Sequence, residues 1–236
     1  MIDVIGKKEF KRMNIKDYID KELKNYVIGL NILLLVICFN KWFEKAEIEY
    51  IFQLEEIIFP ILNSVIVSSF IGVFAFVFDA LYSAEVKDAI TMMKFFKRPG
   101  TKIFTKIKEN SLKDDRIDNE LARKVYKQII DNIPKDDEKY AYENYKWYSI
   151  YNKYEKENKI LVSQREYLLC RDLCVATVTE ALLVLAGMII GIIPWSLKIY
   201  ILFGILYIIT LVSTYNKADR FCRNVIAKDI SKEIKN

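Results

Sequence analysis

Four apolar stretches constrain the fold of this chain more than any other feature. They run from Tyr26 to Phe39, Ile57 to Phe78, Leu173 to Ile193 and Ile199 to Tyr215, with the charged residues concentrated between them. A helix that crosses a bilayer needs about 20 mostly apolar residues, and about 17 is the lower limit. Two pairs of such stretches predict an all-α integral membrane protein with four transmembrane helices arranged as two hairpins. The alternative for any single stretch is a helix buried in a soluble core.

The Lys and Arg residues predict which segments face the cytoplasm, because cytoplasmic segments carry an excess of them. Seven lie in residues 1–25, twenty in residues 84–171 and six after Tyr215, but only two in residues 40–56 and one in residues 194–198. The expected division is a cytoplasmic N-terminal segment (1–25), a first hairpin (26–83), a cytoplasmic helical insert (84–171), a second hairpin (172–215) and a cytoplasmic tail (216–236). We therefore expect a bacterial-type inner membrane protein with both termini inside, whose insert and tails form one bundle.

Several classes of chemistry are excluded or unsupported by composition. The chain has no His, which removes the Ser-His-Asp triad and histidine zinc sites. It has no phosphate loop, dinucleotide fingerprint or nucleophile elbow. The four cysteines, Cys38, Cys170, Cys174 and Cys222, have neither a recognised zinc spacing nor a disulfide framework, and are expected to be buried or acylated. We therefore predict no enzyme, no cofactor and no metal site.

The insert reads as helical. From a possible N-cap at Asp115, apolar residues recur every four positions, at Ile117, Leu121, Val125 and Ile129. A second helix, rich in aromatic residues, is expected from Asp136 to Glu157, with Trp147 and Tyr151 on one face. These rings could contact a partner protein or stack on a base. Aromatic residues at helical spacing more often pack in a core or a subunit contact.

Glu180 stands out because it is a carboxylate within an apolar stretch. Acidic residues inside a membrane usually face the bundle interior or a water-filled path. The alternative places Glu180 at the membrane surface, in contact with headgroups. Thr177 shares its helix face, and Asn31, Asn63, Ser64 and Ser68 supply further polar groups in the first two stretches. Such residues line pores, although they more often bring membrane helices into close contact.

A basic cluster follows the second apolar stretch. Its members are Lys94, Lys97, Arg98, Lys102, Lys106 and Lys108. Clusters of this size next to a membrane attract anionic headgroups, at about 1 kcal/mol for each residue. The same charges also follow from cytoplasmic topology alone. Binding to a nucleotide or nucleic acid phosphate is a third option, which the absence of a glycine-rich loop disfavours.

Four short motifs resemble a pattern found in uncharacterised bacterial multi-pass membrane proteins: Arg98-Pro99-Gly100, Asp115-Arg116-Ile117-Asp118, Trp147 to Tyr151, and Tyr167 to Leu173. The resemblance covers about residues 57 to 223. Two hairpins around a helical insert also resemble the small four-span effectors of bacterial anti-phage systems. That resemblance implies a protein that permeabilises the membrane after an upstream sensor is triggered, and it carries no catalytic residues.

The expected function is therefore an oligomeric membrane effector or gated pore, whose insert receives a signal and whose Glu180 lies near the inner mouth. The first alternative is a non-conducting scaffold that recruits a cytoplasmic partner through Trp147 and Tyr151. The second is a small-solute transporter. The partners expected are anionic lipid headgroups and further copies of the chain.

Overall fold

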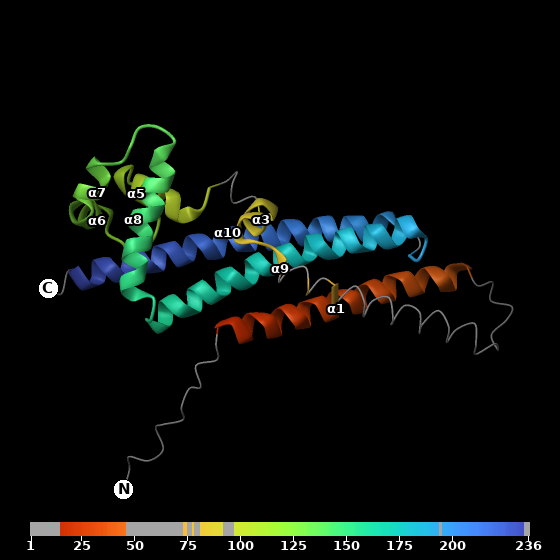
Figure 1. Cartoon of the computed structure of the whole chain (residues 1–236). Coiled ribbons are helices and arrows are strands. Elements are labelled where there is room, and N and C mark those ends of the chain that lie inside the picture. The colour runs from red at the N-terminus through yellow and green to blue at the C-terminus, as the bar shows by residue number, and fades with distance from the viewer. Residues whose placement is uncertain are drawn as a thin grey trace, which may run out of the picture.

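The computed structural model describes residues 15–45, 73–74, 77, 81–91, 97–193 and 195–233, and every regular element among them is helical (Figure 1). The helices are α1 (Ile15–Lys45), α3 (Ala84–Ile90), the 3-10 helix η1 (Pro99–Lys102), α5 (Ile103–Lys108), α6 (Asn119–Val125), α7 (Lys127–Asp131), α8 (Glu138–Tyr154), α9 (Asn158–Ile190) and α10 (Leu197–Glu233). Side chains of α1 are described at residues 18–34 and 37. The predicted all-α class is confirmed for this part of the chain.

The three long helices α1, α9 and α10 lie side by side and form a stem (Figure 1). A cluster of buried apolar side chains holds them together, made of Leu30, Leu34, Val184, Met188, Ile193, Ile199 and Phe203. The turn from α9 to α10 begins at Gly191, whose φ of 86° is left-handed and favours glycine. The amide of Ile192 donates to the Gly187 carbonyl at 2.9 Å and closes the end of α9.

Two helices of the stem, α9 and α10, are long and apolar enough to cross a membrane by length and composition. They contain the third and fourth predicted spans. The first predicted span lies on α1, and the second, Ile57–Phe78, lies outside the described residues except for 73, 74 and 77. The membrane-protein prediction therefore has support from two helices, and the count of four spans is not confirmed.

A small helical head packs against the end of the stem (Figure 1). We use this name for residues 97–157 together with residues 216–233 of α10. Its core combines side chains from all of these elements: Ile103, Phe104, Ile107, Leu112, Ile117, Ala122, Tyr126, Ile130, Trp147, Ile150, Tyr154, Phe221, Cys222, Val225, Ile226 and Ile230, joined by Ile160 of α9. The described part of the C-terminal tail thus packs in one core with the insert, as the sequence led us to expect.

Two details of the insert differ from the sequence prediction. The N-cap is Asp118, which accepts hydrogen bonds from the amides of Glu120 and Leu121, and not Asp115. Residues 114–117 instead form a turn, in which the Ile117 amide donates to the Asp114 carbonyl at 2.9 Å. The apolar run expected as one helix is also divided into α6 and α7 at Tyr126.

The stem and the head share continuous helices. Helix α9 runs without a break across the predicted boundary at residues 171 and 172, and α10 does so at residues 215 and 216. The first described side chains of α1 do not join the head. Leu23 and Val27 of α1 instead pack against Ala176 of α9. Because α9 and α10 are continuous between the two parts, a movement of the head would also displace these two helices.

Candidate functional site

Glu180 lies fully buried between α9 and α1, with 0% of its surface exposed. The Asn31 side-chain nitrogen Nδ2 donates to Glu180 Oε1 at 3.0 Å, and also to the Val27 carbonyl of its own helix at 2.8 Å. Glu180 is the only charged residue between Asp172 and Lys198. The one acidic side chain in this apolar part of α9 is therefore paired with Asn31, the one asparagine within residues 26–39 of α1.

A second polar contact joins the same two helices one turn away. The hydroxyl of Thr177, also fully buried, lies 2.7 Å from the hydroxyl of Tyr26. Thr177 donates its own hydrogen to the Leu173 carbonyl at 2.8 Å, so Tyr26 is the donor in the contact between helices. We call Tyr26, Asn31, Thr177 and Glu180 the polar seam. It lies within apolar packing from Leu23, Val27, Leu30 and Leu34.

The seam is incompletely satisfied. Asn31 Oδ1 and Glu180 Oε2 are both buried, and neither has a hydrogen-bond partner within the part of the chain that the structure describes. A buried polar atom without a partner costs about 1–3 kcal/mol. The contact between α1 and α9 therefore combines a specific polar bond with a free-energy penalty.

The sequence predicted Glu180 and Thr177 as polar positions on one face, and the structure brings them together against α1. Glu180 is fully buried among the described residues, between α9 and α1. Asn63, Ser64 and Ser68 lie outside the described residues. Asn31 was visible as a polar residue in an apolar stretch, but its pairing with Glu180 and the role of Tyr26 depend on how α1 is rotated against α9.

The described members of the basic cluster make several different contacts within the chain. Arg98 forms an ion pair with Asp88, and Lys106 Nζ lies 3.0 Å from Asp219 Oδ1. Lys97 and Lys102 gather over the ring of Tyr140, with Nζ 4.8 and 5.8 Å from its centre. Lys108 is exposed at the end of α5 and Lys94 lies outside the described residues. The charges predicted to act together are thus assigned to different contacts.

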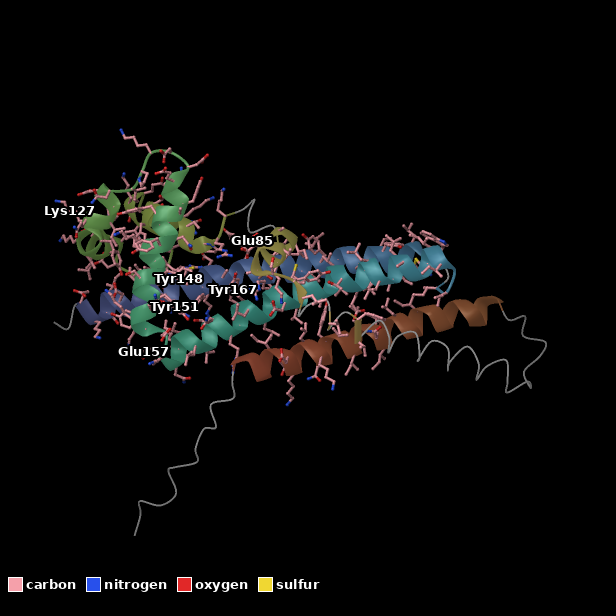
Figure 2. All side chains as sticks on the ribbon, viewed as in Figure 1. Glu85, Lys127, Tyr148, Tyr151, Glu157 and Tyr167 are labelled. Atoms are coloured by element: carbon pink, nitrogen blue, oxygen red, sulfur yellow. The ribbon has the colours of Figure 1, made fainter. Side chains whose placement is uncertain are left out.

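Trp147 belongs to the head core and is only 4% exposed, so it offers no surface to a partner. Its ring stacks on Tyr151 at 5.6 Å and meets Phe221 edge-on at 5.3 Å, while its Nε1 donates to the Cys222 carbonyl at 3.4 Å. Tyr151 is half-buried and donates to Gln164 (Figure 2). This corrects the assignment of Trp147 to a partner surface. Burial raises the pKa of Tyr151 above its ordinary value.

The exposed aromatic residues of α8 are different ones. Tyr145 is 70% exposed and Tyr148 is 45% exposed. Figure 2 shows Tyr148 beside Tyr151 on this helix. The aromatic face predicted from the sequence therefore has an inner part, which packs the head, and an outer part, which faces away from it.

The described cysteines are not arranged as a metal site. Cys222 is buried in the head, Cys174 is buried in the stem, and Cys170 is partly exposed. Burial raises the pKa of both Cys170 and Cys222, so these thiols are poor nucleophiles. In the described part of the chain, no three Cys, Asp or Glu side chains come close enough together to hold a metal ion.

Comparisons with protein-family models, with curated proteins and with solved structures each found no match. A functional proposal for this chain therefore rests on the chemistry of its own residues.

Proposed function

We propose that this chain is a gated membrane effector: a cytoplasmic head receives a signal, and the long helices carry it to the polar seam. One observation carries the proposal. Two of the three stem helices also enter the head, α10 through its core and α9 through Ile160. A change in head packing therefore bears on the helix that holds Glu180.

The surface of the stem supports its placement in a bilayer. The residues exposed on it are large and apolar, among them Leu182, Ile189, Ile190, Ile201, Ile205, Ile208, Ile209 and Val212. Apolar surface costs about 25 cal/mol for each Å² left in water, and lipid removes that cost. Trp195, 63% exposed at the α9–α10 turn, lies where interfacial aromatic residues are expected. The excess of Lys and Arg in residues 1–25, 84–171 and 216–236 supports a cytoplasmic location for both termini and the head.

The seam supplies the gate. In the arrangement seen, Glu180 is sealed against Asn31 and cannot contact water. Separation of α1 from α9 would expose the carboxylate and the Thr177 hydroxyl along one line, which is the chemistry of a polar path across a membrane. Several copies of so thin a stem would enclose such a path, so the effector acts as a homo-oligomer.

The test is ion leakage from liposomes that contain the purified chain. Asn31→Leu removes the bond that seals Glu180 and should increase leakage, because the closed seam loses its polar contact. Glu180→Gln removes the carboxylate from the path and should decrease cation leakage. Thr214→Val is the matched control: this buried hydroxyl bonds only to the Thr210 carbonyl of its own helix, at 2.7 Å. Tight liposomes for both the wild type and Asn31→Leu would contradict the proposal.

A second candidate function is a non-conducting scaffold, which is favoured by the exposure of Tyr145 and Tyr148 on α8. It predicts tight liposomes for every variant and a cytoplasmic protein that co-purifies with the chain. Tyr145→Ser together with Tyr148→Ser should then remove that protein, while the helix content measured by circular dichroism stays that of the wild type. No contact among the described residues specifically favours the transporter alternative.

A further inference from the structure

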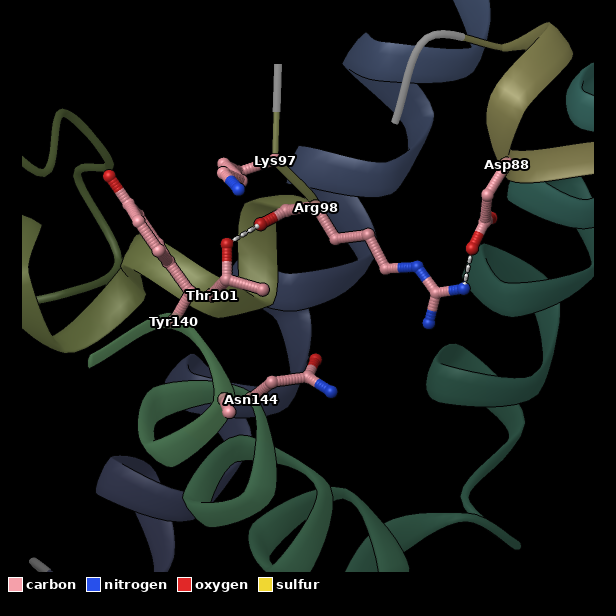
Figure 3. A pocket seen from close by; sticks show the side chains of 7 residues that line it. Asp88, Lys97, Arg98, Thr101, Tyr140 and Asn144 are labelled. Atoms are coloured by element: carbon pink, nitrogen blue, oxygen red, sulfur yellow. Dashed lines mark hydrogen bonds and ion pairs between the residues drawn. The ribbon is translucent and has the colours of Figure 1, made fainter. Parts of the chain in front are cut away.

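A pocket lies in the head where it meets the stem, away from the polar seam (Figure 3). Its volume is about 460 Å³, and it is lined by Asp88 of α3, by Lys97, Arg98 and Thr101 at the start of the head, and by Tyr140, Ala141 and Asn144 of α8. Pockets of about 300–1,000 Å³ are typical of small-molecule sites. Nothing in the proposed gate uses these residues.

The pocket has an excess of positive charge. Lys97 Nζ lies 4.8 Å from the centre of the Tyr140 ring, Lys139 Nζ lies 4.9 Å from it and Lys102 Nζ lies 5.8 Å from it. Three ammonium groups therefore surround one aromatic ring. Asp88 is the only acidic residue among those that line the pocket. A ligand that fits here is negatively charged.

The backbone holds the two pocket cations in a defined position. Lys97 has a φ of 60°, a left-handed conformation that is uncommon for residues other than glycine and tends to occur at functional sites. The next carbonyl, that of Arg98, accepts hydrogen bonds from the Thr101 amide at 2.9 Å and the Thr101 hydroxyl at 2.6 Å. Lys97 and Arg98 both line the pocket from adjacent positions, and Figure 3 shows the Arg98 side chain extended toward Asp88.

Arg98 already forms an ion pair with the carboxylate of Asp88. Its Nη2 bonds to Asp88 Oδ2, while Asp88 Oδ1 is buried without a partner among the described residues. A guanidinium has five donors in a fork that matches phosphate as well as carboxylate. Asp88 therefore occupies part of the position that an external oxyanion would take, and the two would compete for Arg98.

We propose that this pocket binds a phosphate group, held by Arg98 and Lys97, with the Asn144 amide as a further donor and the Tyr140 ring beside the rest of the ligand. The phosphate belongs either to a soluble phosphorylated molecule or to the headgroup of an anionic lipid. Both present the same chemistry to the two cations, and the experiment below separates them.

Helix α3 connects this pocket to the stem. Asp88 faces Arg98, and its neighbour Lys87 contacts Asp172 of α9, with Nζ 3.1 Å from Oδ1. Asp172 also holds Arg171 at 3.0 Å and lies on the same helix as Glu180. Phosphate that takes Arg98 from Asp88 would loosen this connection between the head and α9. Only this last step rests on the function proposed above, since binding itself does not depend on leakage.

The experiment uses the full chain in a neutral detergent. Inorganic pyrophosphate is the soluble probe, phosphatidylglycerol is the lipid probe, and phosphatidylcholine is the uncharged reference. Calorimetry measures pyrophosphate binding, and the rise in unfolding temperature reports both probes, because a ligand that binds the folded state stabilises it. Stabilisation by pyrophosphate alone identifies a soluble ligand, and stabilisation by phosphatidylglycerol but not phosphatidylcholine identifies a headgroup.

Three variants decide whether the pocket is responsible. Lys97→Gln should weaken binding about tenfold, the loss expected for one charge-assisted hydrogen bond. Lys108→Gln, an exposed lysine of the same basic segment that does not line the pocket, should bind as the wild type does. Asp88→Asn removes the competing carboxylate and should tighten binding, whereas a merely structural Asp88 would leave binding unchanged or weaker.

Two results would overturn the proposal: neither probe stabilises the wild type beyond phosphatidylcholine, or Lys97→Gln and Lys108→Gln bind equally. Both can be obtained without any leakage measurement. Conversely, Asn31→Leu liposomes test the gate without any ligand, so failure of the pocket and failure of the gate can be told apart.

Discussion

The two halves of α10 use the same kind of residue in opposite ways. Ile208, in the stem, is 60% exposed, whereas Ile226, in the head, is 0% exposed. The two positions are eighteen residues apart, which is five full turns at 3.6 residues per turn, so they lie on the same side of one helix. The stem half presents its apolar side outward, and the head half covers that side with α5 to α8.

Polar groups show the same difference. In the stem half, the hydroxyls of Thr210 and Thr214 donate to carbonyls of their own helix, at 2.8 and 2.7 Å. In the head half, Asp229 accepts hydrogen bonds from the hydroxyls of Tyr126 and Tyr154, at 2.7 and 2.9 Å, which come from two other parts of the chain. The head is thus assembled by polar bonds between elements, whereas the two threonines of α10 in the stem bond within their own helix. Two tyrosines of the same half do contact other elements: Tyr207 donates to the Ile90 carbonyl at 2.9 Å, and the Tyr200 hydroxyl lies 3.3 Å from Met188 Sδ.

The largest effect that separates the two halves should come from shortening each isoleucine. Ile226→Ala should lower the free energy of unfolding of the head by about 3 kcal/mol, because it leaves a cavity in a packed core. Ile208→Ala should change it by about 0.5 kcal/mol or less, since the side chain is exposed. Denaturant titration in detergent measures both, followed by the fluorescence of Trp147 in a chain whose Trp42 and Trp195 are Phe.

Equal losses for the two variants would break the comparison. That result would mean that the outer side of the stem half is also packed against protein, as it would be in a tight oligomer.

An intermediate effect is expected from the polar groups. Asp229→Ala leaves the buried hydroxyls of Tyr126 and Tyr154 without their acceptor and should cost about 2 kcal/mol of head stability. The matched control is Thr214→Val, which keeps the volume of the side chain and removes only a bond within its own helix. The same titration measures both. A loss for Thr214→Val as large as that for Asp229→Ala would show that a hydroxyl bonded within its own helix contributes as much stability as a buried acceptor that joins two elements.

The smallest effect concerns pH. Arg116 bonds to Asp114 and also donates to Asn224 of α10 at 2.7 Å, and its hydrogen bonds and charge lower the pKa of Asp114 below 3.8. Because the pKa is lower in the folded chain, the stabilisation is present above the unfolded pKa and is lost as the pH falls through the folded pKa. Asp114→Asn should therefore cost about 0.5 kcal/mol at neutral pH, a value typical of partly exposed ion pairs, and nothing in strong acid. A difference that persists at low pH would contradict this reasoning.

Part of the candidate site was predictable from the sequence. A carboxylate among apolar residues must be paired or shielded wherever the helix lies, so Glu180 was identified as informative from composition alone. Its partner was not, because Asn31 lies 149 residues away and meets it only when α1 is docked and rotated. The ion pair of Lys106 with Asp219 was equally unpredictable from the sequence. So was the pocket that Asp88 and Tyr140 line from two separate helices.

The sequence by itself determined that the described chain is helical, that α9 and α10 are long enough to span a bilayer, and that one acid, Glu180, lies within their apolar stretches. These properties follow from runs of apolar residues and their spacing, which are local. Only the tertiary structure decided that Trp147 is core and Tyr145 is surface, or that Ile226 is covered and Ile208 is not. The physical reason is that a side chain is buried only when a second element covers it, and the sequence of one helix does not say which element will do so.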